Sequence, residues 1–367
     1  MGLFIGLMSG TSIDGIDAVL VDFKDNGTSQ IIATCGVNWT PQEKDMFNSL
    51  CQPGSNEIHR AGLAGNIYAE KAGELINNLL KISPFSAEDI EAIGSHGQTI
   101  RHEPDEGFTV QIGNHAKLAA LTNIDVVCDF RSMDIACGGE GAPLVPAFHK
   151  EICAIPNRTR FIVNIGGIAN VTALIPNKHV FGFDTGPGNT LMDNVAQRFL
   201  NQPCDKGGEV ASKGDIKHDI VNYYLQDPYF SKRPPKSTGR ELFNKDFLNR
   251  CQRFNLLSVE DKLATATELT AVSIINGINS LGPRGEIYIC GGGLHNNFLM
   301  SRLEHYANLS NHTCLKSIES IGVDPDYLEA YAFAWLAYKF KRHSPIDMSW
   351  VTGAKRPSIL GCLYPHP

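Results

Sequence analysis

The sequence feature that most constrains the fold is a theme of strand, glycine-containing turn and strand that occurs in both halves of the chain. Residues 3–8 and 18–23 are apolar, strand-like runs, and they flank a polar, glycine-bounded segment at 9–15. Residues 161–174 repeat the pattern around a Gly-Gly turn. Such a pattern predicts a β-hairpin. An internal duplication is the simplest account of the repeat, and a chain of 367 residues is long enough for two such halves.

Other periodic segments predict the elements between and after the hairpins. Ser86-Ala-Glu-Asp89 and Ser258-Val-Glu-Asp261 have the form of helix N-terminal capping boxes. We expect strands at 90–94, 181–184 and 286–290, and helices at about 63–79, 190–200, 258–280, from 296 onward and at 329–340.

The turn of the first hairpin is a candidate phosphate-binding loop. Phosphate oxygens need backbone N–H groups close by, and glycine allows that approach because it has no Cβ. The alternative is a plain hairpin, and the chain has no Walker sequence, Gly-x4-Gly-Lys-Ser/Thr. We assign to the ATP phosphates the residues Gly10, Thr11, Ser12, Ile13, Asp14, Gly15, Ile16 and Asp17.

Two later glycine turns complete the predicted nucleotide site. The second hairpin offers Asn164, Gly166, Gly167 and Asn170 as a second phosphate loop. Gly291, Gly292 and Gly293 stand between a strand and a helix, where small residues let an adenosine lie against the backbone. A Rossmann site is the rival interpretation of the third turn, but it lacks the Gly-x-Gly-x-x-Gly pattern.

This order of elements resembles that of the actin, heat-shock ATPase and sugar-kinase superfamily. The resemblance implies an α/β, two-domain, actin-like ATPase fold, ribonuclease H-like and duplicated, with an interdomain cleft for nucleotide and sugar. The glycine-rich stretch at 138–143 suits a linker or a site loop. We therefore predict one domain at 1–130, with the first phosphate loop, and another at 131–367, with the second loop, the catalytic residue and the adenosine site.

Asp184 is the candidate catalytic residue. It ends a strand and precedes a stiff Gly-Pro-Gly turn and a helix, so an N-cap or Asx turn is its structural alternative. A phosphotransferase needs one carboxylate that takes the proton of the nucleophile. Asp14 and Asp17 lie beside the first loop and could orient Mg²⁺ through its water ligands, or could simply tie the hairpin together.

Composition limits the partners of the protein. The 32 basic and 39 acidic residues give a net charge of −7, which disfavours nucleic acids and anionic membranes. No apolar run approaches the roughly 20 residues that cross a bilayer, and no basic segment precedes the first apolar residues. We therefore expect a cytoplasmic protein. Its ten cysteines include no Cys-x-x-Cys pair, which favours buried, reduced thiols over a disulfide framework or a zinc site.

Several longer and unusual segments are spread over almost the whole chain: Gly6-Leu-Met-Ser-Gly-Thr-Ser-Ile-Asp-Gly-Ile-Asp17, Ser95-His-Gly-Gln-Thr-Ile-Arg-His102, Asp129-Phe-Arg131, Gly141-Ala-Pro-Leu-Val-Pro-Ala-Phe-His149, Asn164-Ile-Gly-Gly-Ile-Ala-Asn170, Phe183-Asp-Thr-Gly-Pro-Gly-Asn189, Lys236-Ser-Thr-Gly-Arg240, Gly291-Gly-Gly293 and Val351-Thr-Gly-Ala354. In these segments the chain resembles the anhydro-N-acetylmuramic acid kinase family. One departure is Glu140, where the family pattern leads us to expect Gln, and this leaves the role of that side chain open.

The resemblance implies a specific reaction. ATP, with magnesium, would phosphorylate O6 of 1,6-anhydro-N-acetylmuramic acid while water opens the anhydro bridge. The product would be N-acetylmuramic acid 6-phosphate, an intermediate of peptidoglycan recycling. Asp184 would deprotonate the attacking water, residues 10–17 would bind the ATP phosphates, and the chain would form a homodimer.

Further polar residues are candidates for sugar contacts. They are His96, Gln98, Thr99, Arg131 and Glu329, of which the first four are expected in strand-end loops. His96 could instead be a structural histidine, and Arg131 a structural ion pair. The lactyl carboxylate of the substrate requires a cation or a helix N-terminus, for which Arg131 is the first choice and Arg240 the second. We expect the basic segment 232–236 to be solvated surface.

Two other functions remain as alternatives at this stage. A kinase of the same fold could phosphorylate another sugar or a small carboxylate. A non-enzymatic, ATP-driven conformational switch is the third hypothesis, and it would require a client-binding region that we do not find in the sequence.

Overall fold

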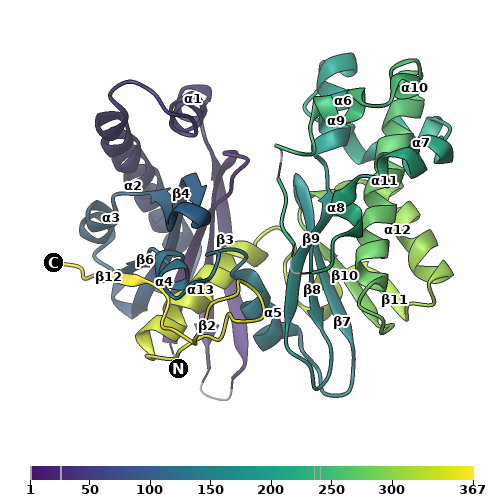
Figure 1. Cartoon of the computed structure of the whole chain (residues 1–367). Helices are drawn as coiled ribbons and strands as arrows, with labels where there is room; N and C mark the ends of the chain where they lie inside the picture. Colours follow the sequence, from purple (N-terminus) through teal and green to yellow (C-terminus); the bar gives the residue numbers. More distant parts are fainter. Residues whose placement is uncertain (1, 25–26, 235, 240) are drawn as a thin grey trace. The chain divides into compact units, whose positions relative to one another are not determined.

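The computed structural model describes residues 2–24, 27–234, 236–239 and 241–367. The chain divides into two compact units, of which the first consists of Met1–Phe148 and Tyr327–Pro367 and the second of His149–Asp326. Each unit has its own sheet (Figure 1). The sequence-predicted division at residues 130 and 131 remains a prediction about domains, and the compact units group 131–148 and 327–367 with the first half.

The sheet of the first unit is mixed. β1 pairs with β2 in antiparallel and with β4 in parallel orientation, and β6 lies parallel to β4 on the far side. The strand order is β12-β6-β4-β1-β2-β3, and β5 pairs with the end of β4. The strands are β1 (Gly2–Ser9), β2 (Gly15–Phe23), β3 (Ser29–Asn38), β4 (Ile90–Glu103), β5 (Phe108–Ile112), β6 (Val126–Cys128) and β12 (Cys362–Tyr364).

The sheet of the second unit repeats this topology. Its order is β11-β10-β7-β8-β9, with β7, β8 and β9 antiparallel and with β10 parallel to both β7 and β11. The same directions in the same order occur in β6-β4-β1-β2-β3. The duplication and the predicted two-part, actin-like α/β fold are therefore confirmed, whereas the predicted cleft stays a prediction. The strands are β7 (Arg160–Ile165), β8 (Ile168–Leu174), β9 (Phe181–Pro187), β10 (Glu286–Cys290) and β11 (Cys314–Ser317).

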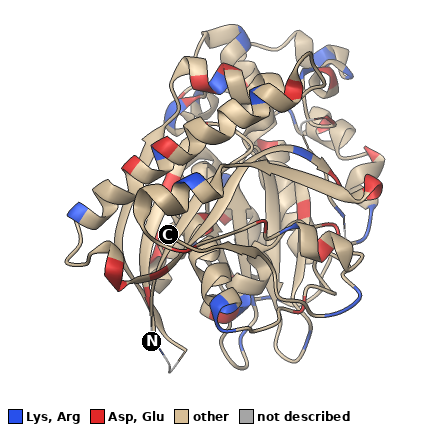
Figure 2. Ribbon diagram, turned by 90° about the vertical axis from the view of Figure 1, so that its left-hand side faces the viewer, with Lys and Arg blue, Asp and Glu red and all other residues tan. Residues whose placement is uncertain are grey.

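Helices cover the sheets and separate the strands along the chain. Lys and Arg are interspersed with Asp and Glu on the helices (Figure 2). The helices are α1 (Pro41–Leu50), α2 (Glu57–Lys81), α3 (His115–Thr122), α4 (Ser132–Ala136), α5 (Val145–Cys153), α6 (Thr190–Leu200), α7 (His218–Tyr224), α8 (Pro228–Ser231), α9 (Lys245–Asn249), α10 (Gln252–Asn255), α11 (Val259–Asn279), α12 (Asn297–Leu309) and α13 (Leu328–Lys341). Single 3₁₀ turns lie at 87–89, 104–106, 206–208, 211–213, 292–295 and 318–321. None of the helices in the described residues is long and apolar enough to cross a membrane.

Two contacts show how closely α13 packs on the first sheet. A Cβ added to Gly6 of β1 would come within 1.8 Å of the Ala330 carbonyl oxygen, and one added to Gly94 of β4 within 2.0 Å of the Phe333 carbonyl oxygen. Only glycine allows this approach of strand and helix backbones. The helix is therefore part of the first unit, although it follows the second unit in the sequence.

Most of the predicted elements are present, with one important difference. The hairpins, the helix that begins after Ser258 and the strand at 286–290 are confirmed. The strand predicted at 90–94 continues to Glu103 because its second half pairs with β5. The expectation that His96, Gln98 and Thr99 lie in a strand-end loop is therefore wrong, since all three belong to β4.

Candidate functional site

The tip of the first hairpin carries the residues predicted to bind the ATP phosphates. Thr11 and Ser12 are exposed at the tip. Ile13 is buried and has a φ of 55°, a conformation that is strained for a β-branched side chain. Strain of this kind persists where surrounding contacts enforce it, and it concentrates at functional sites. The buried Ile13 anchors the tip while its neighbours face solvent.

Hydrogen bonds from buried side chains hold both ends of this tip. The Ser9 hydroxyl lies 2.6 Å from Gln98 Oε1 and 2.8 Å from the Gly15 carbonyl oxygen, and it accepts a bond from Trp39 Nε1 at 3.3 Å. Gln98 Nε2 donates to the Gly10 carbonyl at 2.9 Å. Gln98 is fully buried, so these contacts favour a role in fixing the loop. Its predicted contact with the sugar stays a prediction.

His96, Arg131 and Glu329 lie together beside the first hairpin. Both Nε and Nη2 of Arg131 lie near His96 Nε2, at 3.2 and 2.9 Å, and His96 Nδ1 lies 3.1 Å from the Ser9 carbonyl oxygen. Nε2 is therefore the acceptor and Nδ1 the donor, which requires a neutral ring. Burial, reinforced by the charge of Arg131, lowers the pKa of His96 to about 3.

Arg131 and Glu329 are matched charges in this cluster. Burial lowers the pKa of Arg131 to about 10, opposed by the charges of Glu329 and Asp134, so the guanidinium remains protonated at neutral pH. For the acid Glu329 burial has the opposite effect and raises the pKa. The charge of Arg131 lowers this pKa, and the charge of Asp17 raises it. The cluster thus brings a charged guanidinium close to a carboxyl group whose pKa is raised, and their contacts with the sugar stay a prediction.

The buried carboxylate of Asp134 fixes the loop after Arg131. Asp134 accepts from the Gly141 N–H at 2.7 Å and from the Thr352 hydroxyl at 2.8 Å. Arg131 Nη1 donates to the Gly141 carbonyl at 2.8 Å. Gly141 is therefore held on both sides of its backbone, and the stretch at 138–143 is a fixed part of the first unit.

The two predicted magnesium residues differ in their surroundings. Asp14 forms an exposed ion pair with Lys44 at 3.1 Å, and 71% of its side chain is accessible. Asp17, also exposed, lies near enough to Glu329 to raise its pKa. Within the described residues there is no group of three or more His, Cys, Asp or Glu side chains that could hold a metal ion. Mg²⁺ often binds through one or two carboxylates, its own waters and substrate phosphates, so magnesium binding by Asp14 and Asp17 stays a prediction.

The second unit brings together the second hairpin turn and the turn after β9. The Gly167 carbonyl accepts from the Gly188 and Thr190 N–H groups at 2.9 and 3.1 Å, and the Gly166 carbonyl accepts from the Asn189 N–H at 2.8 Å. A Cβ on Gly188 would lie 2.3 Å from the Gly166 oxygen. The Gly-Gly turn is thus fixed against the start of α6.

The third glycine turn joins the same place in the second unit. Gly291 has a φ of 79°, and a Cβ there would lie 2.1 Å from Asn164 Oδ1, while one on Gly293 would lie 2.3 Å from Ile165 Cγ2. Gly292 is exposed. Both turns are thus tight backbone segments that require glycine, and they lie side by side. Their contact with ATP stays a prediction.

The prediction that Asp184 ends its strand is wrong, since the edge strand β9 continues to Pro187 and Asp184 lies within it, opposite Asn170 of β8. A loop after α8 covers the free edge of β9 at this residue. The Asp184 N–H donates to the Lys236 carbonyl at 3.1 Å, and the Thr238 N–H donates to Asp184 Oδ2 at 2.9 Å. The Tyr229 hydroxyl donates to the Asp184 carbonyl at 2.6 Å. Backbone and carboxylate are therefore both fixed, so the structural alternative of an N-cap does not describe this residue.

The electrostatic surroundings of Asp184 suit a base. Burial raises the pKa of its carboxyl to about 6, the charge of Glu241 raises it further, and the Thr238 N–H and Lys236 lower it. A carboxylate whose pKa lies near 6 is ionised at neutral pH and binds a proton far more strongly than an exposed one. These are the properties that the proposed role requires.

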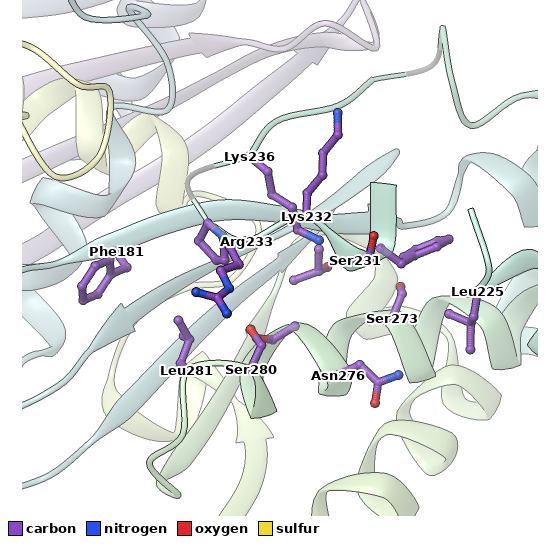
Figure 3. A pocket seen from close by; sticks show the side chains of 14 residues that line it. Phe181, Leu225, Ser231, Lys232, Arg233, Lys236, Ser273, Asn276, Ser280 and Leu281 are labelled. Carbon is purple, nitrogen blue, oxygen red and sulfur yellow. The ribbon is translucent and has the colours of Figure 1, made fainter. Parts of the chain in front are cut away.

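A cavity of about 630 Å³ lies beside β9 in the second unit, between the loop after α8 and the C-terminal half of α11 (Figure 3). Lys232 and Arg233, which line it, are exposed as predicted, but Lys236 is half-buried and its Nζ donates to the Tyr229 carbonyl at 3.2 Å. The loop therefore lies across this cavity from α11, and its backbone holds Asp184.

Comparison with known proteins decides the family. A profile of the anhydro-N-acetylmuramic acid kinase family matches residues 2–366. The chain belongs to this family. It is 47% identical over 362 residues to the anhydro-N-acetylmuramic acid kinase of Shewanella sp. (strain MR-4), covering 98% of this chain and 97% of that protein. It is 42% identical over 369 residues to that of Burkholderia orbicola (strain MC0-3), covering 100% and 97%. Component A of the (R)-2-hydroxyglutaryl-CoA dehydratase of Acidaminococcus fermentans gives a TM-score of 0.47 at 14% identity, over 92% of this chain and 98% of that chain.

Two segments that mark the resemblance to the anhydro-N-acetylmuramic acid kinase family contain residues whose roles the sequence did not show. Thr238, in Lys236-Ser-Thr-Gly-Arg240, binds the Asp184 carboxylate, and Thr352, in Val351-Thr-Gly-Ala354, binds Asp134. Tyr229 had no such signal. Arg240, the second choice for the lactyl carboxylate, lies outside the described residues.

Thr99 has a partner on the neighbouring strand. Its hydroxyl accepts from Gln111 Nε2 of β5 at 3.2 Å. Its side chain is half-buried, so a sugar contact remains a prediction. The structure thus groups the predicted residues into two sets, with the first hairpin, His96, Gln98, Arg131 and Glu329 in the first unit, and with Asp184 and the two later glycine turns in the second.

Proposed function

We propose that this chain is an ATP-dependent kinase that opens 1,6-anhydro-N-acetylmuramic acid with water and phosphorylates O6 to give N-acetylmuramic acid 6-phosphate, in peptidoglycan recycling. The observation that carries the proposal is Asp184, whose carboxylate is held by the Thr238 N–H and whose pKa lies near 6. Membership of the anhydro-N-acetylmuramic acid kinase family supports the choice of substrate.

Asp184 acts as the general base in this reaction. It takes a proton from a water molecule, whose oxygen attacks the anomeric carbon of the sugar as the bond from C1 to O6 breaks. The transition state resembles an oxocarbenium ion, as in glycoside hydrolysis. O6 leaves carrying negative charge and takes the γ-phosphoryl group of ATP, so ADP is released and no separate general acid is needed.

The first hairpin supplies backbone N–H groups and the exposed hydroxyls of Thr11 and Ser12 for the phosphates of ATP. Magnesium would bind ATP and reach Asp17 directly or through water, and it would neutralise charge on the transferring phosphoryl group. Ser9 and Gln98 keep the hairpin in place through their contacts with its ends.

Arg131 binds the lactyl carboxylate of the sugar, because its guanidinium is charged and half-buried beside the neutral His96. Glu329 accepts hydrogen bonds from sugar hydroxyls. The family resemblance further supports a homodimer in the cytoplasm, with this small sugar and ATP, and no nucleic acid, as its ligands.

The test uses purified protein, ATP, magnesium and 1,6-anhydro-N-acetylmuramic acid in water enriched in ¹⁸O. We expect ADP release coupled to a phosphorylated sugar that carries one ¹⁸O atom at C1 and none in its phosphate, because the attacking water ends at the anomeric carbon. N-acetylglucosamine serves as the comparison acceptor. Turnover on N-acetylglucosamine with none on the anhydro sugar would instead support a kinase with another acceptor, and ATP binding without any phosphorylated product would support a conformational switch.

A further inference from the structure

Two cysteines face each other where the C-terminal strand joins the first sheet. β12 runs antiparallel to β6, and Cys362 lies opposite Cys128 in their register. Their sulfur atoms are 3.5 Å apart, with both thiols free. We propose that Cys128 and Cys362 form a reversible intrachain disulfide under oxidising conditions, which latches the C-terminal strand to β6.

The backbone already has the geometry that a disulfide requires. Directly opposed residues of antiparallel strands have Cα atoms about 4.5–5.5 Å apart, and disulfides span Cα separations of about 4.4–6.8 Å. Small rotations of the two side chains therefore bring the sulfurs to bonding distance, and the strands need not move.

Other contacts keep the C-terminal segment beside β6 before any bond forms. Asp125 Oδ1 accepts from the His366 N–H at 3.1 Å and lies 2.8 Å from His366 Nδ1, while Lys341 of α13 donates to Asp125 Oδ2 at 2.9 Å. Gly361 passes so close to β6 that a Cβ would lie 3.2 Å from the Cys128 carbonyl oxygen. The entropy cost of bringing two thiols together is thus already met by folding.

Exposure assigns different chemical roles to the two thiols. Cys362 is exposed, whereas Cys128 is buried. Burial raises the pKa of Cys128 strongly, and so do Cys362 and the charge of Asp129. The accessible Cys362 is therefore the thiol that meets the oxidant, and Cys128 is the resolving thiol.

A peroxide serves as the oxidant. The Cys362 thiolate attacks one peroxide oxygen, the O–O bond breaks, and a sulfenic acid and hydroxide result; the hydroxide takes up a proton to give water. The Cys128 sulfur, on losing its proton, then attacks the Cys362 sulfur and expels the sulfenic oxygen, which leaves as a second water. Two thiols lose two electrons and two protons in all, and added dithiol reverses the bond by exchange.

The bond would secure a strand that matters to the site. β6 leads directly into residues 129–131, and Arg131 is part of the cluster with His96. The two cysteines are 234 positions apart, and closing so long a loop removes much of the freedom of the unfolded chain. The oxidised protein should therefore unfold at a higher temperature than the reduced protein.

The experiment treats the reduced full-length protein with hydrogen peroxide, blocks the remaining thiols, and maps peptides without reduction. We expect one linked peptide that joins Cys128 to Cys362, and a midpoint of thermal unfolding that rises by about 5 °C or more and returns after dithiothreitol. Cys204→Ser, which removes another exposed cysteine, should behave like the wild type. Cys362→Ser should give neither the linked peptide nor the rise.

The result that would overturn the proposal is equally direct. Oxidised wild-type protein in which both thiols can still be alkylated, or in which either sulfur is joined to a different cysteine or to a second chain, shows that the latch does not form. Persistence of the rise in midpoint in Cys362→Ser shows that the effect has another origin. Neither result depends on the catalytic role of Asp184, so the proposed function is tested separately.

Discussion

At the scale of single residues, hydrogen bonds hold Asp184 in place, although burial makes its negative charge unfavourable for the folded state. Its backbone and carboxylate are fixed by Lys236, Thr238 and Tyr229, yet burial still raises its pKa to about 6. A folded-state pKa above the ordinary value means that the folded state binds its proton more tightly than the unfolded state, so stability falls as pH rises from about 4 to about 6. Catalytic groups commonly lower stability in this way.

Asp184→Asn tests both consequences in one variant. We expect the rate of ADP release with the anhydro sugar to fall by about 10²–10⁴-fold, because an amide cannot accept the proton of water. ATP binding, measured by calorimetry, should persist. The thermal midpoint should rise at pH 7, where the wild type carries the buried charge, and not at pH 4. Asp105→Asn, at an exposed position, is the control that should change neither quantity, and retained turnover in Asp184→Asn would place the base elsewhere.

The pH dependence of the wild type provides a second test. As the proposed general base, Asp184 has to be ionised, so kcat/KM should be constant above pH 7 and fall about tenfold per unit well below pH 6. The measurement is initial rate against pH from 5 to 8 at subsaturating sugar. A fall with a midpoint near 4, the ordinary value for an aspartate, would show that burial does not tune this carboxyl.

Tyr229 holds the backbone of Asp184, and this contact can be tested without changing the carboxylate. Tyr229→Phe removes the 2.6 Å hydrogen bond to the Asp184 carbonyl and keeps the ring on which Lys236 lies at 4.6 Å. We expect kcat to fall by about tenfold with little change in KM, since about 1.4 kcal/mol of positioning energy is lost. Tyr223→Phe removes an exposed hydroxyl bond to the Arg250 carbonyl and is the matched control. An equal loss of kcat in both variants would show that the effect comes from a general loss of stability.

At the scale of elements, sequence patterns predicted what is determined locally. The two hairpins follow from apolar runs around glycine turns, and the start of α11 follows from Ser258, whose hydroxyl accepts from the Asp261 N–H at 3.1 Å. β4 was cut short in the prediction because its second half is a strand only through its pairing with β5. The contacts of Asp184 could not be predicted, since Tyr229 and Thr238 lie 45 and 54 positions further along the chain.

The contact between α13 and the first sheet can be tested with glycine substitutions. Gly94→Ala puts a methyl group 2.0 Å from the Phe333 carbonyl oxygen, so helix and strand must separate. We expect a loss of about 2–4 kcal/mol in the free energy of unfolding, measured with urea. Gly62→Ala in α2, where a Cβ would meet nothing within 4 Å, should instead add up to about 1 kcal/mol. An unchanged free energy of unfolding in Gly94→Ala would show that α13 can shift to make room for the methyl group.

At the scale of the whole molecule, the order and directions of β6-β4-β1-β2-β3 are repeated in β11-β10-β7-β8-β9. The two units differ in which parts of the chain complete them. The second unit is continuous in sequence, and its core gathers residues from β7 to α12. The first unit is completed only when the chain returns with α13, which packs against β1, β2 and β4. Duplicated sheets therefore do not imply two halves of the chain that fold independently of each other.

This asymmetry predicts how fragments fold. Residues 145–326, which keep α5 whole, should fold cooperatively alone, as followed by circular dichroism on heating. Residues 1–148 alone should not, because the face of β1 and β4 that receives α13 is left bare. Joining 1–148 to 327–367 through a short glycine-serine linker should restore a cooperative transition, since the rings of Phe148 and Tyr331 lie 4.8 Å apart and the two ends are close. Cooperative unfolding of 1–148 by itself would show that α13 is added to a unit that is already stable without it.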